Sequence, residues 1–115
     1  MYQSYMEVIY NQEWEDFDDF MRKYSPASDP EAYLHCMTLG NFFQEAGVLA
    51  EMKAMDPEIM WRHDGGNWIR VWEKMEPLIK GFRKRQNNPL FWASFENLAY
   101  EIKKINEEKL LELNT

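Results

Sequence analysis

The sequence is poor in cysteine, glycine and proline, with one cysteine and five each of the other two among 115 residues. A lone cysteine cannot form a disulfide within the chain, which fits a reducing cytoplasm. Scarce glycine and proline leave long stretches without turn signals, and the β-branched residues that strands favour are few. These scarcities together favour helices over strands and predict an all-α fold.

Long hydrophobic runs are also missing. No apolar stretch approaches the roughly 18–20 residues of a membrane-spanning helix, and no signal peptide is visible. We therefore expect a soluble, cytoplasmic protein without a membrane span. Because the formal net charge is −7, we expect phosphate to repel the protein and prevent direct binding to nucleic acid. The basic patch at 80–85 is interpreted as a solvated helix end, where positive charge suits the helix dipole.

The chain is instead rich in large apolar side chains. Hydrophobic residues make up 45% of it and aromatic residues 16%, with five tryptophans and eight methionines. This composition rules out disorder and predicts a core of large, flat and flexible side chains. A chain of this length is one domain by default, so residues 1–115 are expected to share a single core.

Residues 68–83 form the stretch around which we expect the other helices to pack. Its apolar residues recur every three or four positions, as on one face of a helix: Trp68, Val71, Trp72, Met75, Leu78, Ile79 and Phe82. Pro77 removes a backbone donor and crowds the carbonyl of Glu73, so the helix must kink or break there. We predict an all-α, single-domain bundle of five or six helices, with a proline-kinked central helix and a long C-terminal helix.

The N-terminal region is acidic and has a helical pattern. Apolar spacing indicates two helices at about 2–10 and 12–24, with Asn11 capping the second. The second helix carries the densest carboxylates, which we call the acidic face: Glu13, Glu15, Asp16, Asp18 and Asp19. We interpret this face as solvated, because a four-helix di-metal site needs Glu-x-x-His on two helices and that motif is absent. No metal or other cofactor is expected.

Between these regions, local signals mark the ends of further helices. Ser28 and Glu31 have the spacing of a capping box and predict a helix that ends at Gly47. The turn at 63–66, which contains two glycines, is expected to be the most flexible point in the chain. Asn67 is then expected to cap the central helix.

The last helix is predicted to start after Asn88, with Pro89 in its first turn, and to run to about residue 113. Its apolar residues form a heptad face: Phe91, Phe95, Leu98, Ile102 and Ile105. At about 1.5 Å per residue, this helix is longer than so small a body needs. Its tail, about 106–115, therefore either projects or packs on another chain. The residues expected to bind a partner there are Ile105, Leu110, Leu111 and Leu113.

The sequence offers little for catalysis. Its two histidines are His35, which lies among apolar neighbours, and His63, which precedes Asp64 in a turn. No nucleophile elbow, Walker-type loop, dinucleotide fingerprint or zinc spacing occurs. We therefore expect no enzymatic activity. The tryptophans and methionines are interpreted as core, with a ligand pocket between the helices as the alternative.

Three motifs stand out along the chain: Asn-Phe-Phe-Gln-Glu-Ala-Gly-Val-Leu at 41–49, Trp72 with Pro77, Ile79 and Arg83, and Phe-Glu-Asn-Leu-Ala at 95–99. This pattern, over about 30–103, resembles a family of small helical prokaryotic proteins known as a domain of unknown function. Gln44 departs from it, since the family usually has glutamate there. Many relatives carry an N-terminal membrane span that this chain lacks. The resemblance implies a helical fold and brings no established activity.

Arg83 and Glu96 flank apolar faces on either side of the predicted turn at 87–89. We hypothesise an ion pair between them that joins the central and final helices. Loss of Arg83 would then leave Glu96 unpaired and cost about 3 kcal/mol or more. The alternative, that both side chains are solvated, stays open.

Three functions are considered. The first is a non-enzymatic interaction module that self-associates or docks a protein partner through the C-terminal helix. The second is an acidic inhibitor of a nucleic-acid enzyme, in which the acidic face mimics phosphates as small phage-encoded proteins do. The third is binding of a small ligand between the helices.

Overall fold

The computed structural model describes residues 2–114, and within that range all regular structure is helical. The N-terminal helix α1 continues directly into a π-helical segment, η1, and four longer α-helices follow. Their bounds are α1 Tyr2–Met6, η1 Glu7–Asn11, α2 Phe17–Tyr24, α3 Pro30–Glu51, α4 Pro57–Arg85 and α5 Ala93–Leu113. The all-α fold with a long C-terminal helix is thus confirmed.

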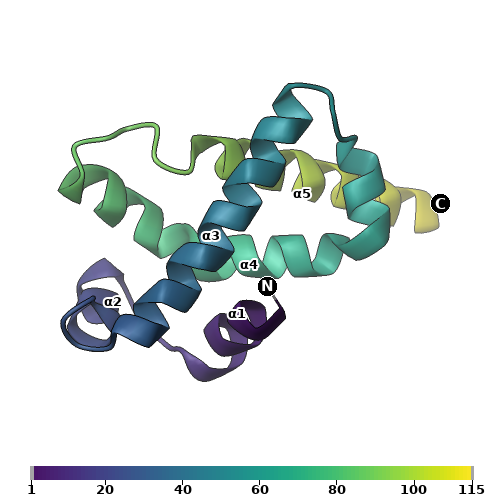
Figure 1. Cartoon of the computed structure of the whole chain (residues 1–115). Helices are drawn as coiled ribbons and strands as arrows, with labels where there is room; N and C mark the ends of the chain where they lie inside the picture. The colour runs from purple at the N-terminus through teal and green to yellow at the C-terminus, as the bar shows by residue number, and fades with distance from the viewer. Residues whose placement is uncertain (1, 115) are drawn as a thin grey trace.

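Three long helices form the body of the molecule. In Figure 1, α4 and α5 run in opposite directions beside each other, and α3 crosses both. The short helices α1 and α2 lie beside α3 and α4, away from α5. The molecule is elongated, with principal extents of 50 × 27 × 22 Å. Within residues 2–114, no helix is both long and apolar enough to cross a bilayer.

The core is built from the predicted face of α4. All seven apolar residues that the spacing of 68–83 placed on one face are buried. The ring of Trp72 packs edge-on against that of Phe95 in α5, with ring centroids 5.4 Å apart. Phe95 in turn stacks on Phe43 of α3, at 5.3 Å. These three rings join the three long helices, and aromatic pairs in such geometries add stability beyond their buried area.

The clearest break in α4 lies earlier than predicted. The backbone departs from helical angles at Asp64 (φ −161°, ψ 42°), whereas the angles at Pro77 stay helical. The axis of α4 also bends in its C-terminal half, the green part in Figure 1. Helix α4 therefore consists of two helical segments, residues 57–63 and 65–85, which meet at Asp64. Asn67 lies inside α4, so the prediction that it caps the helix was wrong.

The predicted helix at 12–24 was also wrong in its first third, since α2 begins only at Phe17. The Asn11 side chain donates to Glu7 instead of capping a new helix, with an N–O distance of 2.9 Å. Gln12 is buried, and its backbone carbonyl accepts from Lys74 Nζ at 2.6 Å while its side chain donates to Ala32 O at 2.9 Å. These contacts with α3 and α4 hold the segment after η1 extended, overriding the local helical pattern.

Two other helix ends differ from prediction. Asp29 caps α3 in place of Ser28, because its carboxylate accepts the Ala32 N–H at 3.1 Å. The final helix begins at Ala93, well after Asn88, and Trp92 immediately before it adopts left-handed angles (φ 53°). Trp92 is buried, so the packing of its ring decides where α5 starts.

Gly47 does not end α3, which continues to Glu51. Its role is to let α5 approach: a Cβ atom added at Gly47 would lie 2.2 Å from the Ser94 carbonyl oxygen. Because the obstacle is backbone, no side-chain rotation can relieve that clash. Glycine is therefore required here for the close crossing of α3 and α5.

We predict that Gly47→Ala lowers the free energy of unfolding by about 2 kcal/mol, because α5 must move away from α3. Gly66→Ala is the matched control, since a Cβ atom there meets nothing within 4 Å. The free energy of unfolding of this control should rise by up to about 1 kcal/mol, because alanine favours helical backbone more than glycine does. Urea denaturation of both variants measures the difference. A Gly47→Ala protein as stable as the wild type would contradict the proposed crossing.

Candidate functional site

A cleft of about 570 Å³ opens beside the break in α4. Helix α1 supplies one wall, α3 another, and the start of α4 the third. The lining is mainly aromatic and aliphatic, with a polar minority, and it consists of Tyr2, Tyr5, Leu39, Phe42, Phe43, Met55, Ile59, Met60, His63, Asp64, Asn67 and Trp68. Its size and apolar lining match those of pockets that bind small molecules.

The walls of the cleft contain both fixed and exposed side chains. Phe43 and Trp68 are buried and meet edge-to-face, with ring centroids 4.2 Å apart. Phe42 and Ile59 are exposed at its margin, Ile59 to 64%. The inner wall is therefore held by core packing, while the margin offers apolar surface to anything that enters.

One edge of the cleft is polar. The Tyr5 hydroxyl donates to Asn67 Oδ1 at 2.6 Å, and Asn67 Nδ2 donates to both carboxylate oxygens of Asp64, at 2.8 and 2.9 Å. Burial raises the pKa of Tyr5, and the charge of Arg70 partly opposes this shift. The phenol therefore keeps its proton at neutral pH and orients the Asn67 amide. The two residues together hold the Asp64 carboxylate in place.

Sequence reasoning found part of this site. It noted the turn around Asp64 and predicted Trp68 as an apolar residue of the central helix. It missed Tyr5 and Asn67 as a bonded pair, because they lie 62 positions apart and carry no shared motif. The π-helical segment that follows α1 was also invisible in the apolar spacing.

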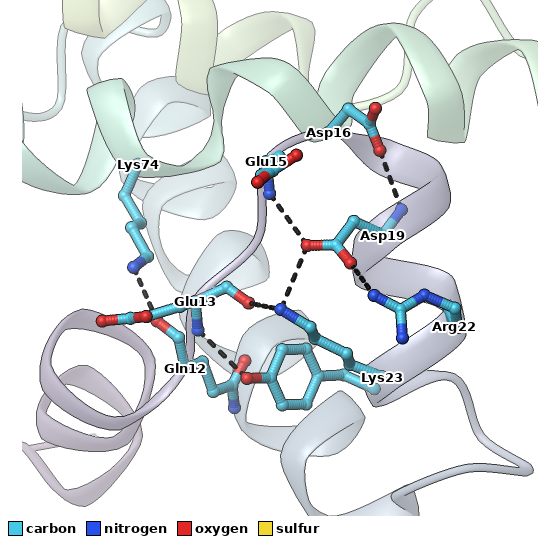
Figure 2. Close-up of polar contacts among 9 residues, drawn as sticks. Gln12, Glu13, Glu15, Asp16, Asp19, Arg22, Lys23 and Lys74 are labelled. Atoms are coloured by element: carbon cyan, nitrogen blue, oxygen red, sulfur yellow. Dashed lines mark hydrogen bonds and ion pairs between the residues drawn. The ribbon is translucent and has the colours of Figure 1, made fainter.

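The acidic face is not a helical face. Only Asp18 and Asp19 lie on α2, whereas Glu13, Glu15 and Asp16 precede it. The Asp16 carboxylate accepts the Asp19 N–H at 2.8 Å (Figure 2), which makes Asp16 the cap of α2.

The Asp19 carboxylate also contacts neighbouring residues. It accepts the Glu15 N–H at 3.0 Å, pairs with Lys23 at 3.2 Å and also contacts Arg22 (Figure 2). The Glu15 hydrogen bond, followed by the two cations, lowers the pKa of Asp19. Two of the five carboxylates, those of Asp16 and Asp19, are therefore engaged in contacts within the segment. Residues 2–114 hold no cluster of three or more histidine, cysteine, aspartate or glutamate side chains suited to a metal ion.

Three further side chains lie among structural contacts. Cys36 is fully buried, and burial raises the pKa of its thiol to about 12, so the thiol stays protonated at neutral pH. Lys74 lies over the Trp14 ring at 4.8 Å, and burial lowers its pKa. His35 meets the Ser4 hydroxyl at 2.9 Å, which ties α1 to α3. None of the three lines the cleft.

The structure brings Arg83 and Glu96 together. Arg83 Nη2 donates to Glu96 Oε1 at 2.8 Å, and Arg83 Nε donates to the Phe91 carbonyl at 2.9 Å. Both side chains are largely covered, with about a quarter of each exposed (22% and 26%). The guanidinium thereby connects α4 to both the loop and the first turn of α5.

The end of α5 lies against the start of α4. Trp61 Nε1 donates to Asn106 Oδ1 at 3.1 Å, and Lys109 pairs with Glu58 at 3.2 Å. Ile105 is half-buried, whereas Leu110, Leu111 and Leu113 are exposed to 50%, 66% and 81%. The tail is therefore attached to its own chain as far as Lys109, and the three leucines after it face solvent.

We predict that Arg83→Ala lowers the free energy of unfolding by about 2 kcal/mol, because it leaves Glu96 and the Phe91 carbonyl without their charged donor. This is less than the roughly 3 kcal/mol expected from the sequence, because about a quarter of each side chain is exposed to solvent. Lys84→Ala, at an exposed neighbour, should change stability by less than about 0.5 kcal/mol. A double-mutant cycle with Glu96→Ala isolates the pair. Equal stability of the Arg83→Ala and Lys84→Ala proteins would show that the pair contributes nothing.

The chain matches the protein family described as Domain of unknown function (DUF4760) over residues 1–102. That match covers most of the sequence, so the protein belongs to this family. Membership of a domain-of-unknown-function family is thereby confirmed, and the domain includes the N-terminal segment that precedes the three motifs at 41–99. No curated protein and no solved structure matches the chain.

Proposed function

We propose that this member of the DUF4760 family is a non-enzymatic binding protein, which holds a small, largely apolar ligand in the cleft between α1, α3 and α4. The observation that carries the proposal is the cleft itself, with its volume of about 570 Å³ and its apolar lining. The fixed pair Phe43 and Trp68 gives it a preformed inner wall. Preformed apolar walls lower the cost of ligand binding, since few side chains must be ordered.

The lining also supports a binding role over a catalytic one. The described residues around the cleft include no serine, threonine, cysteine or lysine that could act as a nucleophile. Asp64 is bonded to Asn67, and the Tyr5 phenol keeps its proton. His63 also lines the cleft and is a residue type that often serves as a general base, but no serine, threonine, cysteine or lysine nucleophile lies beside it among the lining residues, so these polar groups are better suited to orienting a ligand.

We predict that the neutral dye N-phenyl-1-naphthylamine binds the protein with increased dye fluorescence. Ile59→Glu, which places a charge at the margin of the cleft, should weaken binding about tenfold, because the carboxylate must be partly desolvated. Leu111→Glu is the matched control, since Leu111 is similarly exposed (66% against 64%) and lies outside the cleft. Unchanged binding by Ile59→Glu, or equal loss in both variants, would contradict binding in the cleft.

A second candidate function, self-association through the end of α5, is favoured by a separate observation. This end carries the exposed leucines Leu110, Leu111 and Leu113 next to a shallow hollow of about 260 Å³ between Trp61 and the last turns of α5. A segment with both protruding side chains and a hollow can pair with the same segment of a second copy, as a twofold interface requires.

We predict a monomer–dimer equilibrium that Leu110→Glu with Leu113→Glu shifts fully to the monomer, since like charges would meet across the twofold axis. Sedimentation velocity over a concentration series measures the shift. Leu34→Glu, at a similarly exposed leucine of α3 outside this hollow, should leave the equilibrium unchanged. A wild-type protein that is monomeric at every concentration would end this candidate.

The inhibitor hypothesis has less support from the geometry. A phosphate mimic needs free carboxylates at regular spacing on a rigid surface. Here Asp16 caps α2, and Asp19 is paired with Lys23 and Arg22. Only Asp18 and Asp19 of the five acids lie on α2, so the carboxylates do not form the single regular helical face that such a mimic requires.

A further inference from the structure

The cleft is apolar, yet it carries one full charge. Among the described residues that line it, Asp64 is the only side chain charged at pH 7 when histidine is neutral. Asp64 is exposed, and no lysine or arginine within residues 2–114 forms an ion pair with it. Within residues 2–114 the carboxylate therefore has no lysine or arginine partner that would compete with a cationic ligand.

The direction of that carboxylate is fixed. Both of its oxygens accept from Asn67 Nδ2, and Asn67 Oδ1 accepts from the Tyr5 hydroxyl. A carboxylate has about four acceptor positions, so two hydrogen bonds leave further positions free. Arg70, whose charge reaches Tyr5, donates to the Tyr10 hydroxyl at 3.1 Å and does not line the cleft. The polar edge thus presents an acceptor surface with negative charge.

The walls next to this edge also attract positive charge. Five of the lining residues are aromatic: Tyr2, Tyr5, Phe42, Phe43 and Trp68. The faces of aromatic rings are electron-rich and attract cations, including quaternary and primary ammonium groups. A carboxylate beside several rings is the arrangement that recognises an organic cation, whereas an organic anion would be repelled by Asp64 and by the net charge of −7.

We propose that the ligand of the cleft is an organic cation with an apolar body, whose ammonium group lies between the Asp64 carboxylate and the aromatic rings. The apolar body fills the inner wall formed by Phe43 and Trp68. This inference rests on the proposed function, because it names the class of ligand for the same cleft.

The test compares three probes that share one naphthalene ring: 1-naphthylmethylammonium, neutral 1-naphthalenemethanol and anionic 1-naphthoate. Isothermal titration calorimetry at neutral pH and low salt measures each dissociation constant. We expect the ammonium to bind about tenfold more tightly than the alcohol, and the carboxylate more weakly than both. Asp64→Asn should reduce the preference for the ammonium to within about twofold, whereas Asp64→Glu, which keeps the charge, should retain it.

Glu73→Gln is the control for net charge, since Glu73 is an exposed acid of α4 outside the cleft. It should keep the wild-type preference, and circular dichroism verifies that all variants remain helical. Equal binding of the ammonium and the alcohol to the wild type would overturn the cation inference and leave an apolar site. Loss of the preference in Glu73→Gln would also overturn it, by assigning the effect to overall charge. Failure of all three probes to bind would overturn the cleft as a ligand site.

Discussion

The close approach of α3 and α5 is the constraint on which the rest of this structure depends. Two glycines of α3 make it possible: a Cβ atom at Gly47 would strike the backbone of Ser94, and one at Gly40 would lie 2.2 Å from the ring of Trp92. Trp92 fills the space that Gly40 leaves and donates from Nε1 to Asn41 Oδ1 at 2.9 Å. A left-handed backbone is costly for a residue as large as tryptophan. At Trp92 that cost is offset by the burial of the ring and by the hydrogen bond from its Nε1.

The position of the cleft follows from that crossing. Because α3 is held against α5, Phe43 is placed between Phe95 on one side and Trp68 on the other. The side chains on the N-terminal side of Phe43 then face α1 and the start of α4, where α5 supplies no residue to the lining. The short helix α1 covers this region only in part, and the uncovered part is the cleft.

The sequence predicted the elements better than their ends. The spacing of apolar residues identified the buried face of α4, since a helix that packs on two others must repeat its pattern over many turns. The extended segment at 12–16 could not be predicted that way, because it is held by Lys74 from 62 positions away and by the buried Gln12 side chain. Gly47 likewise resembled a helix stop, although its lack of a side chain serves a contact between helices.

The candidate site was harder to predict, for a reason that also explains its chemistry. A break in a helix interrupts the backbone hydrogen-bond pattern, so polar side chains are needed beside it. At Asp64 the protein provides Asn67 from the next turn, and Tyr5 from α1 completes the chain of hydrogen bonds. The side chains at the break are therefore the same groups that give the apolar cleft its one charged edge. The sequence predicted a kink at Pro77, because the effect of proline on a helix is recognisable from that residue alone. The break at Asp64 carries no such local signal, and the hydroxyl that bonds Asn67 beside it comes from Tyr5 of α1, 62 positions away.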